Sequence, residues 1–155
     1  MTVTAVESAA DMRTAVMNEI TDADLFIGSA AVADYRPDSV ATQKIKKTEQ
    51  TMQISLVKNP DILYDVSHLP QRPFTVGFAA ESEKVIEHAR GKLDRKKLDL
   101  IVANDISRSD IGFNQDANEV VLITQTSEHP LPKASKQALA DQIIAFVCTQ
   151  MAESA

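Results

Sequence analysis

The apolar residues of this chain fall into short, nearly continuous runs separated by segments with helical spacing. The run Leu25–Val32 is typical of a strand buried on both faces, and Phe74–Ala80 also predicts a buried strand. Leu98–Asn104 and Glu119–Thr124 predict two more strands, and the β-branched stretch Thr2–Val6 predicts a short strand at the start of the chain. The chain therefore alternates between buried strands and longer intervening segments.

Helices are predicted between and after these strands, and Ser8 and Ser82 are suited to capping the first and third of them in chain order. We expect them at Ser8–Ile20, Ser82–Lys97 and Ser135–Met151. A further helix should begin at Asn59-Pro60-Asp61, where Asn59 can cap, proline suits the first turn and an aspartate favours the positive end of the helix. Alternating strands and helices predict one three-layer α/β domain over residues 1–155, with a mainly parallel sheet.

One segment departs from this alternation. Asp34–Thr51 is polar and predicts a long exposed loop, of the kind that often carries function. After it, Met52, Ile54 and Leu56 alternate with polar residues and predict another strand.

Composition and charge narrow the classes of function. The net charge of −6 offers no general attraction to nucleic acid or to an anionic membrane, so any anion site must be local. Aromatic residues make up 5% of the chain, which disfavours stacking platforms for single-stranded nucleic acid. The single cysteine excludes an intrachain disulfide and favours a cytoplasmic protein, and we expect no segment that spans a membrane.

Candidate chemistry follows the strand ends, because open α/β sheets bind ligands at the carboxyl ends of their strands. The expected strands are followed by Asp34, by Lys58-Asn59-Pro60-Asp61, by Glu81 and by Asn104-Asp105. The Lys58–Asp61 turn joins a cation to a helix amino terminus and indicates an anion site. From spacing alone, a plain helix start beside a solvated lysine is the more usual interpretation of this turn.

The other candidates also leave two interpretations open. Lys44-Ile45-Lys46-Lys47 could close over phosphates or remain a solvated charge run. Lys92 and Lys96 share a helix face, where they could bind an anion or complement the helix dipole. Asp34 could hold a divalent cation or a ribose hydroxyl, or form a turn. The four glycines form neither G-x-G-x-x-G nor a Walker A loop.

A series of longer strings in this order is more specific than any single candidate. They are Ala30–Pro37 (AAVADYRP), Lys44–Lys47 (KIKK), Lys58–Asp61 (KNPD), Gly77–Glu81 (GFAAE), Asp99–Asp105 (DLIVAND) and Gly112–Asn114 (GFN) with Asp116 and Asn118. Together they resemble the phosphopantothenate–cysteine ligase half of the bifunctional bacterial proteins of coenzyme A biosynthesis. The similarity covers nearly the whole chain.

This resemblance implies a Rossmann-like domain that acts as a homodimer. It also implies that CTP activates the carboxylate of 4′-phosphopantothenate as an acyl-cytidylate, which the amine of cysteine then attacks. Mg²⁺ or Mn²⁺ is expected to assist, with Asp34 as the candidate ligand. FMN is not expected, since the flavin-binding decarboxylase half has no counterpart in the chain.

The resemblance assigns nucleotide contacts position by position and leaves the general base unassigned. The expected contacts are Gly28, Ser29, Ala30, Asp34, Lys44, Lys58, Asn59, Pro60, Asp61, Phe78, Lys92 and Lys96. Nothing before Thr2 matches the initial strand and glycine-rich turn of the family, so we expect a domain truncated at its amino terminus. A nucleotide-binding or dimerisation fragment without complete activity is the alternative to an active ligase.

Overall fold

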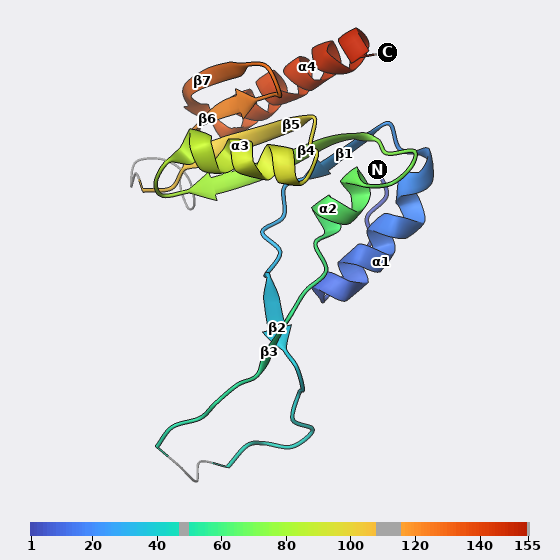
Figure 1. Ribbon diagram of the computed structural model, residues 1–155, viewed down its shortest axis with the longest axis vertical. Helices are drawn as coiled ribbons and strands as arrows, with labels where there is room; N and C mark the ends of the chain where they lie inside the picture. The colour runs from blue at the N-terminus through green and yellow to red at the C-terminus, as the bar shows by residue number, and fades with distance from the viewer. Residues whose placement is uncertain (47–49, 108–115, 155) are drawn as a thin grey trace.

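A five-stranded sheet forms the centre of the computed structural model, which describes residues 1–46, 50–107 and 116–154 (Figure 1). Its strand order is β1-β4-β5-β6-β7. The strands are β1 (Leu25–Gly28), β4 (Phe74–Glu81), β5 (Leu100–Asp105), β6 (Ala117–Ile123) and β7 (Glu128–Ser135). Strands β1, β4 and β5 pair in parallel, whereas β6 is antiparallel to both of its neighbours. Only β6 therefore runs against the others, and the expected mainly parallel sheet is confirmed.

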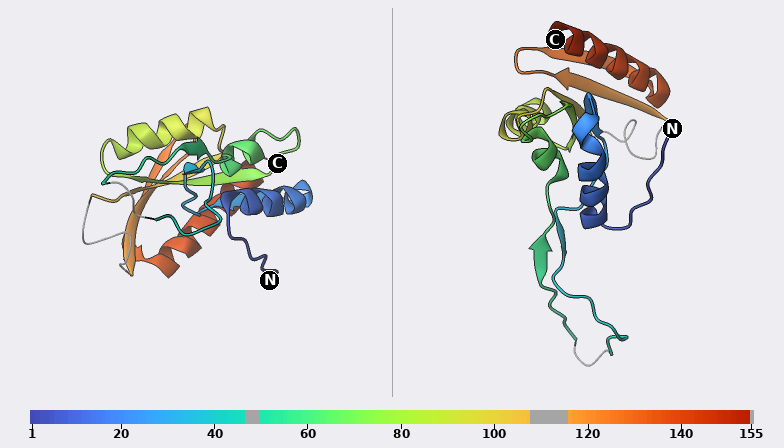
Figure 2. Two further views of the ribbon diagram at one scale, coloured as in Figure 1. Left: turned by 90° about the horizontal axis from the view of Figure 1, so that it is seen from below. Right: turned by 90° about the vertical axis from the view of Figure 1, so that its right-hand side faces the viewer.

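Helices cover both faces of this sheet. On one face, Val76 and Leu100 pack with Leu139 and Val147 of α4 (Lys136–Ser154). On the other face lie α2 (Ile62–Ser67) and α3 (Val85–Arg95), and α1 (Ala9–Glu19) packs beside α2 before the short 3₁₀ helix η1 (Ile20–Asp22). Figure 2 shows α3 and α4 on opposite sides of the sheet. These are the three layers that the sequence predicts.

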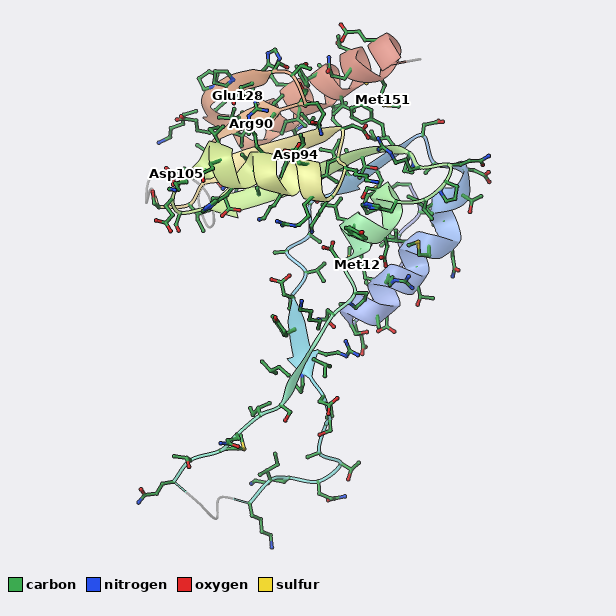
Figure 3. All side chains as sticks on the ribbon, in the orientation of Figure 1. Met12, Arg90, Asp94, Asp105, Glu128 and Met151 are labelled. Atoms are coloured by element: carbon green, nitrogen blue, oxygen red, sulfur yellow. The ribbon has the colours of Figure 1, made fainter. Side chains whose placement is uncertain are left out.

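Two local features fix the helices against the sheet. Arg90 of α3 donates a 2.7 Å hydrogen bond from Nη2 to Oε1 of Glu128 on β7, and Figure 3 labels both residues. A Cβ added at Gly77 of β4 would lie 2.8 Å from Leu98 Cδ1 and 2.9 Å from Leu63 Cδ2. Since real Cβ contacts are not this short, the glycine is what lets α2 approach the sheet closely.

A two-stranded arm leaves the body between β1 and α2. It is formed by β2 (Tyr35–Pro37) and β3 (Leu56–Lys58), which pair antiparallel, and Figure 1 shows it extending far below the sheet. The described part of Asp34–Thr51 is exposed throughout, as expected, but it is not a loop along its whole length because it includes the strand β2. The strand expected through Met52, Ile54 and Leu56 is only partly present, because Met52 and Ile54 lie outside β3 with no strand partner.

The strand predictions differ from the structure at three further places. Thr2–Val6 is exposed and forms no strand, because no strand of the described sheet pairs with it and β-branched residues alone do not hold an extended conformation. Strand β7 is absent from the prediction because Pro130 and Pro132 interrupt its pattern. Such prolines are tolerated at the edge of a sheet, where β7 lies. In addition, β1 ends at Gly28 rather than at Val32.

The helix starts are right at two positions and wrong at two. Ser135, the expected start of the last helix, accepts a hydrogen bond from Ala138 N at 3.2 Å, and α4 begins at the next residue. Ser8 caps α1 in a reciprocal capping box with Asp11, as expected. Ser82 does not cap α3, which begins after Lys84 in a left-handed conformation with φ of 46°. Asn59 does not cap α2 either, because Asp61 two residues later accepts the hydrogen bond from Tyr64 N. Both errors place the helix start two residues early.

Candidate functional site

Two adjoining clefts lie at one edge of the sheet. The carboxyl ends of β1, β4, β5 and β7 meet there with the amino end of β6. The first cleft, of about 160 Å³, lies toward α2, and the second, of about 440 Å³, lies toward β6 and α4. They share Ala30, Val32, Asp34 and Phe78, so these four residues form the seam between them. This is the edge at which parallel α/β sheets bind ligands.

Hydrogen bonds to the backbone fix the wall of the first cleft. Asn59 donates from Nδ2 to the carbonyl of Ala33 at 2.8 Å, and its backbone N–H donates to the carbonyl of Asp34 at 2.8 Å. Arg36 Nη1 donates to the carbonyl of Lys58 at 2.8 Å and to Asn59 Oδ1 at 3.2 Å. The segment that carries Asp34 is therefore tied to the turn before α2, which explains why an asparagine is placed at position 59.

The charged side chains that line the first cleft are Lys96, Asp34 and Asp61, and Lys96 is the cation among them. Its Nζ lies 2.8 Å from Oδ2 and 2.9 Å from Oδ1 of Asp61. The same Asp61 Oδ1 accepts from Tyr64 N at 3.1 Å, so a carboxylate already occupies the positive end of α2. The anion site expected at that helix terminus is thus taken by an internal side chain, and Lys96 remains as the adjacent cation.

The second cleft lies between lysines from two helices. Lys92 of α3 and Lys136 of α4 line it together with the carboxamides Asn104 and Asn118. Lys92 Nζ donates to Glu81 Oε1 at 2.7 Å, and His88 Nδ1 lies 3.4 Å from Glu81 Oε2. The hydrogen bond from Lys92 holds the pKa of Glu81 below its ordinary value against the opposing effect of burial.

Most of the predicted nucleotide contacts come together here. Those that line one or both clefts are Gly28, Ser29, Ala30, Asp34, Asn59, Pro60, Asp61, Phe78, Lys92 and Lys96. Lys58 lies instead on β3, paired with Tyr35, and Lys44 lies exposed on the arm. Neither lines the clefts. Lys47 and Gly112-Phe113-Asn114 lie outside the described residues.

One charged residue of the clefts, Lys136, was not identified from the sequence. Lys136 follows the carboxyl end of β7 directly, so the rule about strand ends would have selected it had that strand been predicted. Asn104 and Asn118 stood in the quoted motifs without an assigned role, and both line the second cleft. Lys136 was therefore not identified because the strand before it, β7, was not predicted.

The protein could supply only some of the ligands of a divalent cation at the clefts. Within residues 1–46, 50–107 and 116–154, no group of three histidine, cysteine, aspartate or glutamate side chains is arranged to bind a metal. Asp34 lies at the seam of the clefts, and Mg²⁺ is commonly bound by one or two carboxylates together with substrate phosphates and water. Asp34 fits that mode, with a phosphorylated ligand supplying the remaining oxygens.

None of the helices in the described part of the chain is long and apolar enough to cross a membrane.

The fold defines a Rossmann-like α/β domain whose two clefts lie at the carboxyl edge of its parallel strands. Residues 1–151 match the family described as the DNA/pantothenate metabolism flavoprotein C-terminal domain, and the chain belongs to that family. The resemblance drawn from the sequence motifs is confirmed at this level.

Individual relatives agree with this assignment. The coenzyme A biosynthesis bifunctional protein CoaBC of Vibrio cholerae serotype O1 is 50% identical over 149 residues, which cover 94% of this chain and 37% of that protein. The protein of the same name from Escherichia coli K12 is 43% identical over 152 residues, covering 96% of this chain and 37% of that protein. The chain thus spans little more than a third of the length of these curated relatives.

Solved structures show the same fold. The crystal structure of the C-terminal domain of coenzyme A biosynthesis bifunctional protein CoaBC superposes with a TM-score of 0.76 at 32% identity, covering 96% of this chain and 67% of that chain. The DNA/pantothenate metabolism flavoprotein from Streptococcus pneumoniae gives a TM-score of 0.75 at 20% identity, which shows a common fold alone. The chain corresponds to the C-terminal part of the CoaBC proteins.

Proposed function

We propose that this chain forms the phosphopantothenate–cysteine ligase part of a coenzyme A biosynthesis protein and uses CTP. One observation carries the proposal: a chain that matches the C-terminal part of the CoaBC proteins presents two joined clefts at the ligand-binding edge of its sheet. A ligase that joins two reactants through a nucleotide needs such adjoining sites, because the carboxylate and the α-phosphorus must meet within about 3–3.5 Å.

The proposed reaction has two steps. A carboxylate oxygen of 4′-phosphopantothenate attacks the α-phosphorus of CTP, and pyrophosphate leaves with the electrons of the broken P–O bond. The amine of cysteine then attacks the acyl carbon, CMP leaves, and the amine gives up a proton as the amide forms. Neither step requires a covalent bond to the protein, so charge stabilisation and positioning are the tasks left to its residues.

The cleft residues suit those tasks. Lys92 and Lys96 bring two ammonium groups to the edge of the clefts, each held by a carboxylate within 2.8 Å. We assign nucleotide contacts to them and to Gly28-Ser29-Ala30, Asn59-Pro60-Asp61 and Phe78. Lys44 and Lys58, from the arm, belong to the same proposal although they do not line the clefts. Mg²⁺ or Mn²⁺ held by Asp34 would neutralise phosphate charge when bound.

The proposal includes a homodimer that works in the cytoplasm. The arm supports the homodimer, because its apolar side chains Val40, Met52 and Ile54 are 84%, 65% and 61% exposed on a segment that projects from the body. Apolar side chains gathered on a projecting segment are typical of a surface that another chain covers. Light scattering behind size exclusion, repeated over a range of concentrations, should give twice the chain mass; a monomer at every concentration would contradict the dimer.

Pyrophosphate release tests the enzymatic function. The 155-residue chain is incubated with CTP and Mg²⁺, and pyrophosphate should appear only after 4′-phosphopantothenate is added. The peptide product should then require cysteine. A CTP-dependent rise in melting temperature without pyrophosphate would replace the ligase by a nucleotide-binding module. Neither signal, together with a concentration-dependent dimer, would indicate a dimerisation fragment.

A further inference from the structure

The second cleft extends beyond every residue assigned to the nucleotide. From the seam at Asp34 and Phe78 it continues to Asn104 and Asn118 at the ends of β5 and β6, and to Lys136 at the start of α4. Its volume of about 440 Å³ lies in the range typical of small-molecule sites. The far end of this cleft therefore has room and polar groups that the nucleotide assignment does not use.

Lys136 differs from the other two lysines of the clefts in its partners. Lys92 is paired with Glu81 and Lys96 with Asp61. Within the part of the chain that the structure describes, the ammonium of Lys136 has neither a carboxylate within 4.0 Å nor a hydrogen-bond partner. Only its backbone N–H is engaged, donating to the carbonyl of Asp116 at 3.0 Å. This ammonium is available to a ligand without first breaking an internal ion pair.

Asn118, which lines the same cleft as Lys136, has hydrogen-bond donors that a ligand can use. Asn118 Oδ1 accepts from Glu119 N at 2.9 Å, which fixes the side chain by its oxygen and leaves the Nδ2 hydrogens as donors. A cation and a fixed amide donor at the end of a cleft recognise an anionic group, since charge-assisted hydrogen bonds are stronger than neutral ones. The overall net charge of −6 would otherwise repel such a ligand.

We propose that Lys136 and Asn118 bind the acid substrate, the phosphorylated carboxylic acid whose carboxylate attacks CTP. This inference rests on the proposed ligase function. The nucleotide occupies the first cleft, the seam and the part of the second cleft beside Ser29 and Lys92, and the acid occupies the remaining part of the second cleft, so the two reacting groups meet beside Asp34. The arrangement follows from the seam residues that both clefts share. The ammonium of Lys136 neutralises negative charge on the acid, and the Nδ2 hydrogens of Asn118 orient the acid.

Direct binding separates this inference from the proposed reaction. The full chain is titrated calorimetrically with 4′-phosphopantothenate and, separately, with CTP and Mg²⁺, as wild type, Lys136→Met and Lys97→Met. Met keeps most of the lysine stem, and Lys97 is an exposed lysine outside both clefts, so the control removes the same charge. Lys136→Met should weaken acid binding about tenfold, equivalent to roughly 1.4 kcal/mol, with CTP affinity unchanged. Lys97→Met should match wild type.

A second variant guards against a folding defect. Asn118→Asp keeps the oxygen that accepts from Glu119 N and places a negative charge at the far end of the cleft, so it should also weaken binding of the acid. Unfolding midpoints are recorded for each variant. The subsite is overturned if wild type binds no acid, if both variants bind it like wild type, or if Lys136→Met weakens CTP and not the acid. Failure of pyrophosphate release with intact acid binding would overturn only the ligase.

Discussion

Asp61 performs two structural roles that two substitutions can separate. Its Oδ1 accepts from Tyr64 N and caps α2, while its carboxylate pairs with Lys96 Nζ. Asp61→Asn retains a side-chain oxygen that can cap and removes the charge, whereas Asp61→Ala removes both. The difference between the variants therefore measures the cap, and the difference between wild type and Asp61→Asn measures the ion pair.

The magnitudes follow from exposure. Losing an aspartate cap costs about 1 kcal/mol. The Asp61 and Lys96 side chains are 46% and 20% exposed, so solvent screens the pair and its contribution should be about 0.5 kcal/mol. Asp61→Asn should thus lower the free energy of unfolding by about 0.5 kcal/mol and Asp61→Ala by about 1.5 kcal/mol. In a chain of this size, each 1 kcal/mol lowers the melting temperature by about 2–4 °C.

Urea unfolding of wild type, both Asp61 variants, Lys96→Met and the double variant Asp61→Asn/Lys96→Met supplies the test. Lys96→Met alone should cost about as much as Asp61→Asn, and the double variant should cost less than the sum. Equal destabilisation by Asp61→Asn and Asp61→Ala would refute the cap. Strict additivity of Asp61→Asn and Lys96→Met would refute the ion pair.

Three other substitutions probe the site. Lys44→Gln should weaken nucleotide use because it removes a cation from the arm, and an unchanged CTP affinity would argue against that contact. Asp34→Asn should weaken Mg²⁺-dependent binding of CTP; an equal response to Mg²⁺ in both proteins would exclude Asp34 as the ligand. Glu81→Gln should destabilise the chain at neutral pH. Since Lys92 lowers the pKa of Glu81 in the folded state, this stabilisation is present above the ordinary glutamate value of about 4.5 and is lost as pH falls through the folded value. Denaturation midpoints that differ equally at pH 7 and pH 3 would contradict the pair.

The sheet could be predicted where burial alone determines the pattern. Phe74–Ala80 and Leu98–Asn104 are apolar on both faces, and both lie in central strands that helices cover. Thr2–Val6 and β7 show where prediction from the sequence pattern fails. A strand is defined by its partner, and neither β-branched residues without a neighbour nor prolines at an edge reveal whether that partner exists.

The candidate site was accessible from sequence because it follows a topological rule. Asp34 after β1 and the Asn59-Pro60-Asp61 turn after β3 line the clefts, as the rule predicts, although β1 ends four residues earlier than expected. Helix caps were harder to predict. Asn59 and Asp61 are both good caps, and the choice between them depended on Asn59 bonding to Ala33 and Arg36, residues far from it in the chain. Pairings such as Lys92 with Glu81 likewise exist only in the folded chain.

A calorimetric titration with CTP in the presence of Mg²⁺, with ATP in parallel, bears most directly on the clefts as a nucleotide site. Wild type should give saturable binding of CTP, Asp34→Asn should weaken it, and Lys97→Met, outside the clefts, should leave it unchanged. Absence of saturable heat with either nucleotide, or equal weakening by both substitutions, would contradict a nucleotide site at this edge of the sheet.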